Sequence, residues 1–177
     1  MGLYKKDQCQ RYERKNCTKE IINVFKNDKK ILLCGNGGSA ADAQHLAAEL
    51  SGRFYIDRPP LFAEALHVNT SYLTAVANDY SFDEVYARLV KAKGRPSDIL
   101  IGISTSGNSS NIIKAIYAAK EVGMISVGFT GKTGGKMVSL CDYLINIPSQ
   151  DAARIQEAHI LIGHIICEIV ERKLFPA

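Results

Sequence analysis

The sequence predicts a single α/β domain in which a parallel sheet carries helices on both faces. The chain of 177 residues is long enough to bury one good core and short for two. Short apolar runs typical of buried strands alternate with stretches of helical periodicity, and a strand, turn and helix unit occurs twice, at residues 31–50 and 98–123. Strands that alternate with helices form a parallel sheet covered on both faces.

The first unit follows an amphipathic helix predicted at residues 12–25. Ile31–Cys34 is a short apolar run, and we expect a buried strand there. The glycine-rich turn Gly35–Gly38 follows directly, and Ser39 is a candidate N-cap for a helix that ends near Leu50.

The second unit has the same order of elements. Ile99–Ile103 predicts a strand, Ser104–Ser109 a polar turn and Asn111–Val122 a helix. The remaining predicted strands are residues 61–68, 125–129 and 143–147, and the remaining predicted helices are 72–76, 82–91 and 152–174. Ligands of doubly wound sheets bind at the carboxyl ends of the strands, so both polar turns are expected at the binding edge.

Composition and charge limit the partners and the compartment. The net charge of +4 is scattered, without the basic run of a nucleic-acid tail, and it suits a small anionic substrate. Five cysteines without C-x-x-C spacing favour neither a disulfide framework nor a cysteine zinc site, which indicates a reducing compartment. We find no signal peptide and no apolar run long enough to cross a bilayer, so we expect a cytoplasmic protein without a membrane partner.

The turn after the second strand has the composition of a phosphate site. Its four hydroxyl side chains belong to Ser104, Thr105, Ser106 and Ser109. They precede a helix, where free backbone N–H groups and the helix dipole favour an anion. The chain has no Walker motif, and its first turn is too compact for a dinucleotide loop, which favours a monophosphate. Such residues also form ordinary turns, and the pattern alone leaves both interpretations open.

Two further groups of polar residues are candidates for ligand contacts. Asn36-Gly37-Gly38 allows close approach to the backbone, and Asn78-Asp79 is either a sugar contact or an ordinary Asx turn. His45 and Glu49 lie four residues apart on a predicted helix, about 6 Å along its axis, and can hold one ion or form a surface pair. We assign ordinary structural roles to His67 and His159.

Four segments together resemble the SIS family of sugar-phosphate isomerases, and within it the isomerases of heptose phosphates. They are CGNGGSAADAQHLAAELSGRF at 34–54, LTAVANDYSFDEVYAR at 73–88, ILIGISTSGNSSNIIKAI at 99–116 and RIQEAHILIGHIICEIVE at 154–171. The resemblance implies a single SIS domain at 30–177 after a helical segment at 1–29, with a five-stranded parallel sheet of flavodoxin type. It also implies a homotetramer with sites at subunit interfaces, and one divalent metal per site, usually zinc.

The expected activity is a ketose–aldose isomerisation of sedoheptulose 7-phosphate to D-glycero-D-manno-heptose 7-phosphate, for surface polysaccharide. By motif, the resemblance implies that the metal ligands are His45, Glu49, Gln156 and His164. It implies that Glu49 and His164 are the catalytic pair. The substrate contacts that it implies are Asn36, Gly37, Gly38, Glu49, Asn78, Asp79, Ser104, Thr105, Ser106, Ser109 and Gln156.

Two alternatives remain open at the level of sequence. One is an SIS isomerase of another sugar phosphate, and the other is a non-catalytic SIS regulator that binds a sugar phosphate or a replication initiator. The presence of both Glu49 and His164 favours chemistry. Because Gln156 and His164 are eight residues apart, about 12 Å along a straight helix, either the helix bends or a neighbouring subunit supplies one of the two, and of these we favour His164.

Overall fold

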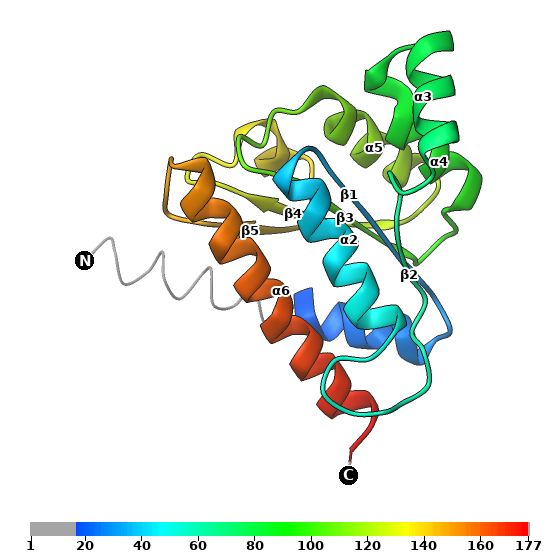
Figure 1. Ribbon diagram of the computed structural model, residues 1–177, viewed down its shortest axis with the longest axis vertical. Helices are drawn as coiled ribbons and strands as arrows, with labels where there is room; N and C mark the ends of the chain where they lie inside the picture. Colours follow the sequence, from blue (N-terminus) through cyan, green and yellow to red (C-terminus); the bar gives the residue numbers. More distant parts are fainter. Residues whose placement is uncertain (1–16, 177) are drawn as a thin grey trace.

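The computed structural model describes residues 17–176 and contains one five-stranded parallel sheet (Figure 1). The strand order is β2-β1-β3-β4-β5. The strands are β1 (Ile31–Gly35), β2 (Ala63–Ala65), β3 (Ile99–Ser104), β4 (Ile125–Thr130) and β5 (Tyr143–Asn146). This is the flavodoxin-type order, so the expected sheet is confirmed.

Helices cover both faces of the sheet, as predicted. Side chains alternate along each strand, so Ile31 and Leu33 face one core cluster while Leu32 and Cys34 face the other. The helix at residues 17–26, α2 (Gly38–Ser51) and α6 (Ala152–Leu174) enclose the first cluster. The second cluster is enclosed by α3 (Thr70–Asp79), α4 (Val85–Lys93) and α5 (Ser110–Glu121), with the 3₁₀ turns η1 (Phe82–Glu84) and η2 (Gly135–Ser139) nearby.

Three predicted boundaries differ from the structure. The strand expected at 61–68 is reduced to β2, an edge strand that pairs only with Ile31–Leu33 of β1. The helix expected at 82–91 begins as η1 and continues as α4. The prediction that Ser39 caps α2 is wrong: Gly37, with φ of +54°, occupies the N-cap position, and Ser39 lies buried in the first turn. Residues 12–16 of the first predicted helix lie outside the described part of the chain.

The strand order brings the two polar turns together. β1 and β3 are neighbours, and the chain leaves β1 through α2 and leaves β3 through α5, which lie on opposite faces. The turns after these strands therefore lie side by side at the carboxyl edge, where the strand order reverses and ligands bind in such sheets. Within residues 17–176, no helix combines the length and apolar character needed to cross a membrane.

Candidate active site

The hydroxyl groups after β3 converge at the N-terminus of α5. Ser104 Oγ lies 2.9 Å from Ser109 Oγ and 3.5 Å from Ser106 Oγ. Ser109 occupies the N-cap position of α5, yet its hydroxyl makes no capping bond to the helix. The hydroxyls thus precede the first-turn N–H groups of α5, and this combination suits a phosphate group.

The loop after β4 supports this cradle from behind. Gly107 has φ of +67°, and a Cβ atom there would lie 2.0 Å from the carbonyl oxygen of Gly134. Only glycine fits both the backbone conformation and this close approach. Asn108 Oδ1 accepts a hydrogen bond from the Lys136 N–H at 3.0 Å, and Thr105 O accepts one from Gly131 N–H at 2.9 Å. These contacts fix the shape of the cradle.

A pair of asparagines joins the two turns. Asn36 and Asn111 exchange two side-chain hydrogen bonds, each 2.9 Å long. Asn111 is buried, and its Oδ1 also accepts the Ile112 N–H at 2.9 Å. Sequence reasoning missed Asn111, although it lies just beyond the STSGNS turn. The side chain of Asn36 therefore ties the first turn to the start of α5, and its contact with substrate stays a prediction.

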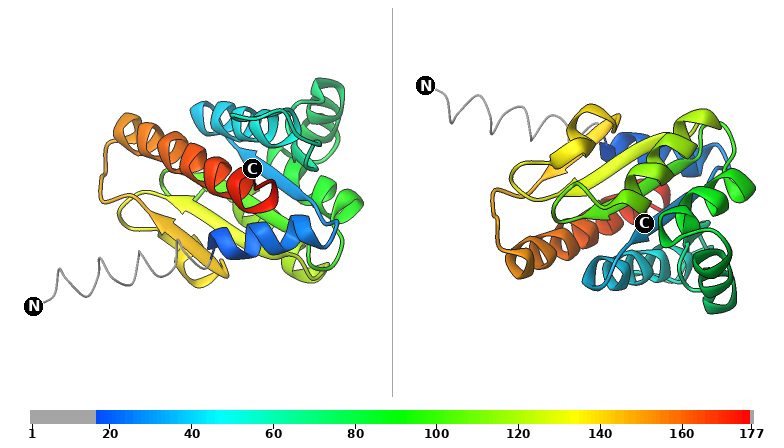
Figure 2. Two further views of the ribbon diagram at one scale, coloured as in Figure 1. Left: turned by 90° about the horizontal axis from the view of Figure 1, so that it is seen from below. Right: turned by 90° about the horizontal axis from the view of Figure 1, so that it is seen from above.

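Helices α2 and α6 run side by side on the same face of the sheet (Figures 1 and 2). A Cβ atom on Gly163 of α6 would lie 2.5 Å from the side chain of Leu46 on α2. A Cβ atom on Gly38, at the start of α2, would likewise lie 2.6 Å from the Gln156 amide. Glycine on each helix therefore permits the close approach that brings the neighbouring side chains together.

This approach assembles three of the predicted residues into one cluster. His45 Nε2 lies 2.9 Å from His164 Nε2 and 3.2 Å from Glu49 Oε1. The ligand atoms of His45, Glu49 and His164 all lie within 4.8 Å of one another. The side chain of His45 is 49% exposed and that of Glu49 is 24% exposed, so the cluster opens to solvent in the single chain.

The arrangement corrects the expected origin of His164. All three clustered residues belong to one chain, so the prediction that a neighbouring subunit supplies His164 is wrong. Gln156 packs against Gly38, seven residues before His45, which corresponds to about 10 Å along the axis of α2. The structure therefore places Gln156 away from the cluster in the same chain, and its role as a metal ligand stays a prediction.

The other candidate residues lie outside this cluster. Asn78 and Asp79 end α3, where both are exposed and Asn78 Nδ2 donates to Asp79 Oδ1 at 3.0 Å. Asp42 lies one turn before His45, and its buried Oδ2 has no hydrogen-bond partner among the described residues. Burial raises the pKa of Asp42, and the nearby His45 opposes that shift. His159 is fully buried and packs edge-on to Phe129, so its expected structural role is confirmed.

Comparison with known proteins identifies the family. Residues 12–131 match the family model described as SIS domain. The chain is 59% identical to the phosphoheptose isomerase of Aneurinibacillus thermoaerophilus over 156 residues, which make up 88% of this chain and 79% of that protein. The chain belongs to the phosphoheptose isomerase family of SIS-domain proteins. Phosphoheptose isomerase 2 of Campylobacter jejuni is 56% identical over 91% of this chain and 80% of its own length.

A solved phosphoheptose isomerase has the same fold. The structure from Neisseria gonorrhoeae matches with a TM-score of 0.85 and 47% identity, covering 90% of this chain and 85% of that one. The expected SIS fold and the expected enzyme class, an aldose–ketose isomerase of a sugar phosphate, are confirmed. The identity extends beyond the shared cradle to most of the chain, which separates this protein from SIS proteins that have the fold alone.

Proposed function

We propose that the chain interconverts sedoheptulose 7-phosphate and D-glycero-D-manno-heptose 7-phosphate, and so supplies heptose for a surface polysaccharide. The observation that carries this proposal is the Glu49 and His164 pair within one cluster, in a chain that is 59% identical over 156 residues to a phosphoheptose isomerase. A regulator that only binds a sugar phosphate needs the cradle but has no use for a carboxylate and an imidazole in this arrangement.

The phosphate binds at the cradle, where the hydroxyls after β3 meet the N-terminus of α5. No basic side chain is required there, because the backbone N–H groups and the helix dipole stabilise the negative charge. The other proposed substrate contacts are Asn36, Gly37, Gly38, Glu49, Asn78, Asp79 and Gln156. Gly37 and Gly38 lie at the turn that Asn36 holds against α5, which supports their place beside the cradle.

The acid/base chemistry falls to Glu49 and His164. Isomerisation moves a proton from C1 of the ketose to C2 of the aldose, and other protons between the two oxygens. Glu49 takes the proton from C1 and returns it at C2, because a carboxylate can both accept and release it at this position. His164 protonates and deprotonates the oxygens. The described cysteines are not competing nucleophiles, since burial raises the pKa of Cys34 and raises that of Cys17, Cys141 and Cys167 to about 12.

The residues of the cluster fit a divalent metal, with zinc as our proposal. Ligand atoms around tetrahedral zinc at about 2.0–2.1 Å from the ion lie about 3.3 Å apart, close to the 2.9 and 3.2 Å separations from His45 Nε2. His45, Glu49 and His164 would hold the ion. Because one lone pair cannot bind a metal and a proton at once, Glu49 and His164 would act as base and acid only when they are released from it. Gln156, the predicted fourth ligand, lies against Gly38 and outside this cluster. A bound metal would supply Lewis-acid polarisation of the substrate carbonyl. The imidazole and carboxylate set is also one that zinc prefers.

We also propose a homotetramer in the cytoplasm, with the sites at subunit interfaces. Leu161, Ile165 and Ile169 form an exposed apolar stripe on α6, at four-residue spacing, next to the His164 cluster. A stripe of this kind supports an oligomer contact beside the site. The four described cysteines are free, which supports a reducing compartment, whereas Cys9 lies outside the described residues.

One assay tests the reaction and its mechanism together. The purified protein is incubated with sedoheptulose 7-phosphate in deuterated water, and the products are followed by NMR. We expect the manno-heptose 7-phosphate with deuterium at C2, and a loss of activity in Glu49→Gln, which keeps the shape of the side chain but not its basicity. No turnover would refute the proposed substrate. Product without solvent label at partial and full conversion would refute Glu49 as the base.

A further inference from the structure

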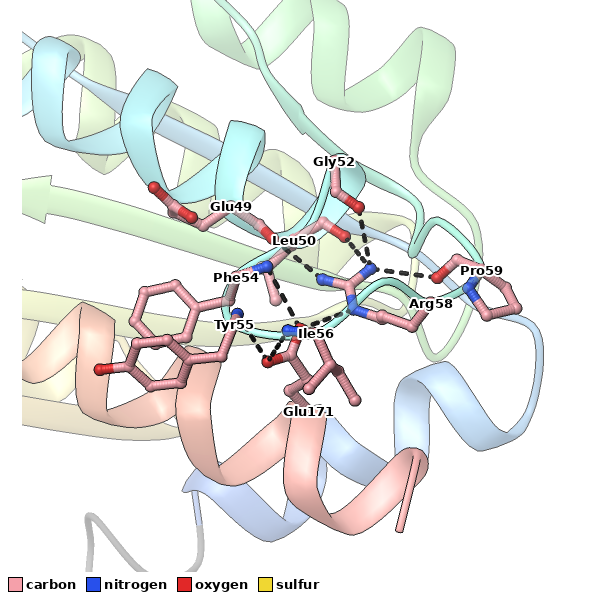
Figure 3. Close-up of polar contacts among 9 residues, drawn as sticks. All are labelled: Glu49, Leu50, Gly52, Phe54, Tyr55, Ile56, Arg58, Pro59 and Glu171. Carbon is pink, nitrogen blue, oxygen red and sulfur yellow. Dashed lines mark hydrogen bonds and ion pairs between the residues drawn. The ribbon is translucent and has the colours of Figure 1, made fainter. Parts of the chain in front are cut away.

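A buried ion pair lies at the C-terminal end of α2, the helix that carries Glu49 (Figure 3). The side chains of Arg58 and Glu171 are 2% and 4% exposed, and Arg58 Nε donates to Glu171 Oε1 at 3.2 Å. The ring of Phe175 covers the guanidinium, with its centroid 5.6 Å from Cζ. This pair connects the loop after α2 with the last turns of α6, and neither residue belongs to the predicted site.

The guanidinium of Arg58 closes the C-terminal end of α2. Its Nη2 donates to the carbonyl of Glu49 at 2.9 Å, and its Nη1 donates to the carbonyl of Leu50 at 2.8 Å and to that of Gly52 at 3.3 Å. The last carbonyls of a helix have no partners within the helix, and a cation there also suits the helix dipole. Arg58 therefore holds the very turn that carries the Glu49 side chain.

The carboxylate of Glu171 organises the loop that follows. It accepts the backbone N–H groups of Phe54, Tyr55 and Ile56 at 3.2, 2.8 and 3.3 Å. Burial raises the pKa of Glu171, but the N–H donors and Arg58 outweigh this effect and the net pKa is lowered. The loop thus wraps around an ionised carboxylate, and it places the Phe54 ring against His164 with the centroids 5.6 Å apart.

We propose that Arg58 and Glu171 are positioning residues for catalysis: Arg58 fixes the turn bearing Glu49, and Glu171 fixes the loop whose Phe54 ring packs on His164. The inference rests on the proposed function for its kinetic consequence, although the geometry it describes is independent of the reaction. Arg58 thus contacts the backbone of Glu49, and Glu171 holds the loop whose Phe54 ring packs on His164. Neither residue touches the reacting atoms.

Stability alone is a weak explanation for this ion pair. Taking two charges out of water costs free energy that their mutual attraction often only balances, so buried pairs contribute little over apolar residues. Here the pair also satisfies backbone groups at seven positions, at the end of α2 and in the loop. An apolar core would leave those groups without partners, so the pair determines the conformation of this segment.

The chain provides a matched control far from the site. Asp98 is 1% exposed and accepts the backbone N–H of Lys30 and of Arg95, and its Oδ2 lies 2.6 Å from Lys30 Nζ. Like Glu171, it is a buried carboxylate that binds a cation and backbone donors. It precedes β3, at the opposite end of the strand from the cradle. Asp98→Asn therefore shows how much stability is lost with a buried carboxylate of this kind when the His45, Glu49 and His164 cluster is not disturbed.

The test compares Glu171→Gln and Arg58→Lys with Asp98→Asn by thermal unfolding, isomerase kinetics and NMR of labelled histidine side chains. The chain has four histidines, so single substitutions assign the His164 signals. We expect kcat to fall by about tenfold or more in Glu171→Gln and Arg58→Lys, with KM changed less than about threefold, because the phosphate cradle is untouched. Their His164 signals should shift. Asp98→Asn should lose stability while kcat and the His164 signals stay unchanged.

Phe54→Leu provides a second arm if the charge variants fail to fold. It leaves the ion pair and the backbone donors in place and removes only the ring on His164, so we expect the His164 signals to move and kcat to fall. Normal kcat and unmoved His164 signals in the folded variants would overturn the proposal. If the wild type does not isomerise the sugar but the His164 signals move in Glu171→Gln and not in Asp98→Asn, the proposed function fails while the positioning role stands.

Discussion

Replacing Gly163 by alanine should separate helices α2 and α6 at the catalytic cluster. The added Cβ atom would lie 2.5, 2.7 and 3.1 Å from three carbons of the Leu46 side chain. Leu46 is only 4% exposed, so it has little room to move aside. Gly163 and Leu46 are the chain neighbours of His164 and His45, whose Nε2 atoms lie 2.9 Å apart. A shift of the helices is therefore transmitted directly to the cluster.

Two opposing effects set the change in stability. Alanine stabilises a helix interior by about 1 kcal/mol relative to glycine, whereas overpacking a core costs about 1–3 kcal/mol. We expect a net loss of about 0–2 kcal/mol, or a Tm lowered by up to about 8 °C for a chain of this size. Activity should fall more steeply, by about tenfold, because a misplacement of about 1 Å in an active site can cost about a hundredfold.

The assay measures Tm and kcat for Gly163→Ala, for Leu46→Val and for the double variant. Leu46→Val removes one carbon where Gly163→Ala adds one, so the double variant should recover much of the lost kcat, with a favourable interaction energy between the two changes. Leu46→Val alone should mainly lower stability, by about 1 kcal/mol. Full activity in Gly163→Ala, or a double variant no better than the singles predict, would refute the close helix contact as the basis of the cluster.

Three other outcomes are expected. Chelation should abolish most of the activity and zinc should restore it; a preparation shown by elemental analysis to be free of metal, yet fully active, would contradict the metal proposal. Mixtures of Glu49→Ala and His164→Ala chains should stay inactive after proven subunit exchange, because both residues serve the same site from one chain, and recovery to about a quarter would indicate a shared site. The folded-state pKa of Glu171 lies below its ordinary 4.5. The contribution of its ionised carboxylate to the free energy of unfolding is therefore fully present above pH 4.5 and is lost as the pH falls through the folded pKa. Urea unfolding should therefore show a stability gap between wild type and Glu171→Gln that narrows below pH 4.5, and a constant gap would contradict the assignment.

The sequence predicted the elements well where the signal is local. The apolar runs at Ile31–Cys34 and Ile99–Ile103 became β1 and β3 almost unchanged, because a strand buried on both faces needs such a run. The turn after each strand was visible from its glycine and hydroxyl content. The start of α2 was misplaced because Gly37 can adopt a positive φ, which lets the helix begin before Ser39.

Contacts between distant residues were the part that could not be predicted from patterns. Asn36 meets Asn111 across 75 positions, Arg58 meets Glu171 across 113, and His45 meets His164 across 119. Periodicity and spacing carry no information on such pairs, and only the family resemblance pointed to His164. The spacing argument then placed His164 in the wrong subunit, because it treated α6 alone and did not include a second helix running parallel to it.

The parallel course of α2 and α6 gives a physical reason for a long substrate. In sedoheptulose 7-phosphate the reacting carbons C1 and C2 lie at the opposite end of the chain from the phosphate, so the proposed site needs two separated binding points. Gly38 starts α2 beside the turn that Asn36 ties to the cradle, and His45 lies about 10 Å farther along the helix. A shorter sugar phosphate held by the same cradle would leave its reacting carbons short of Glu49. We therefore expect the position of the catalytic pair along the helices to select the chain length of the sugar, and the phosphate contacts need not differ from those of other SIS proteins.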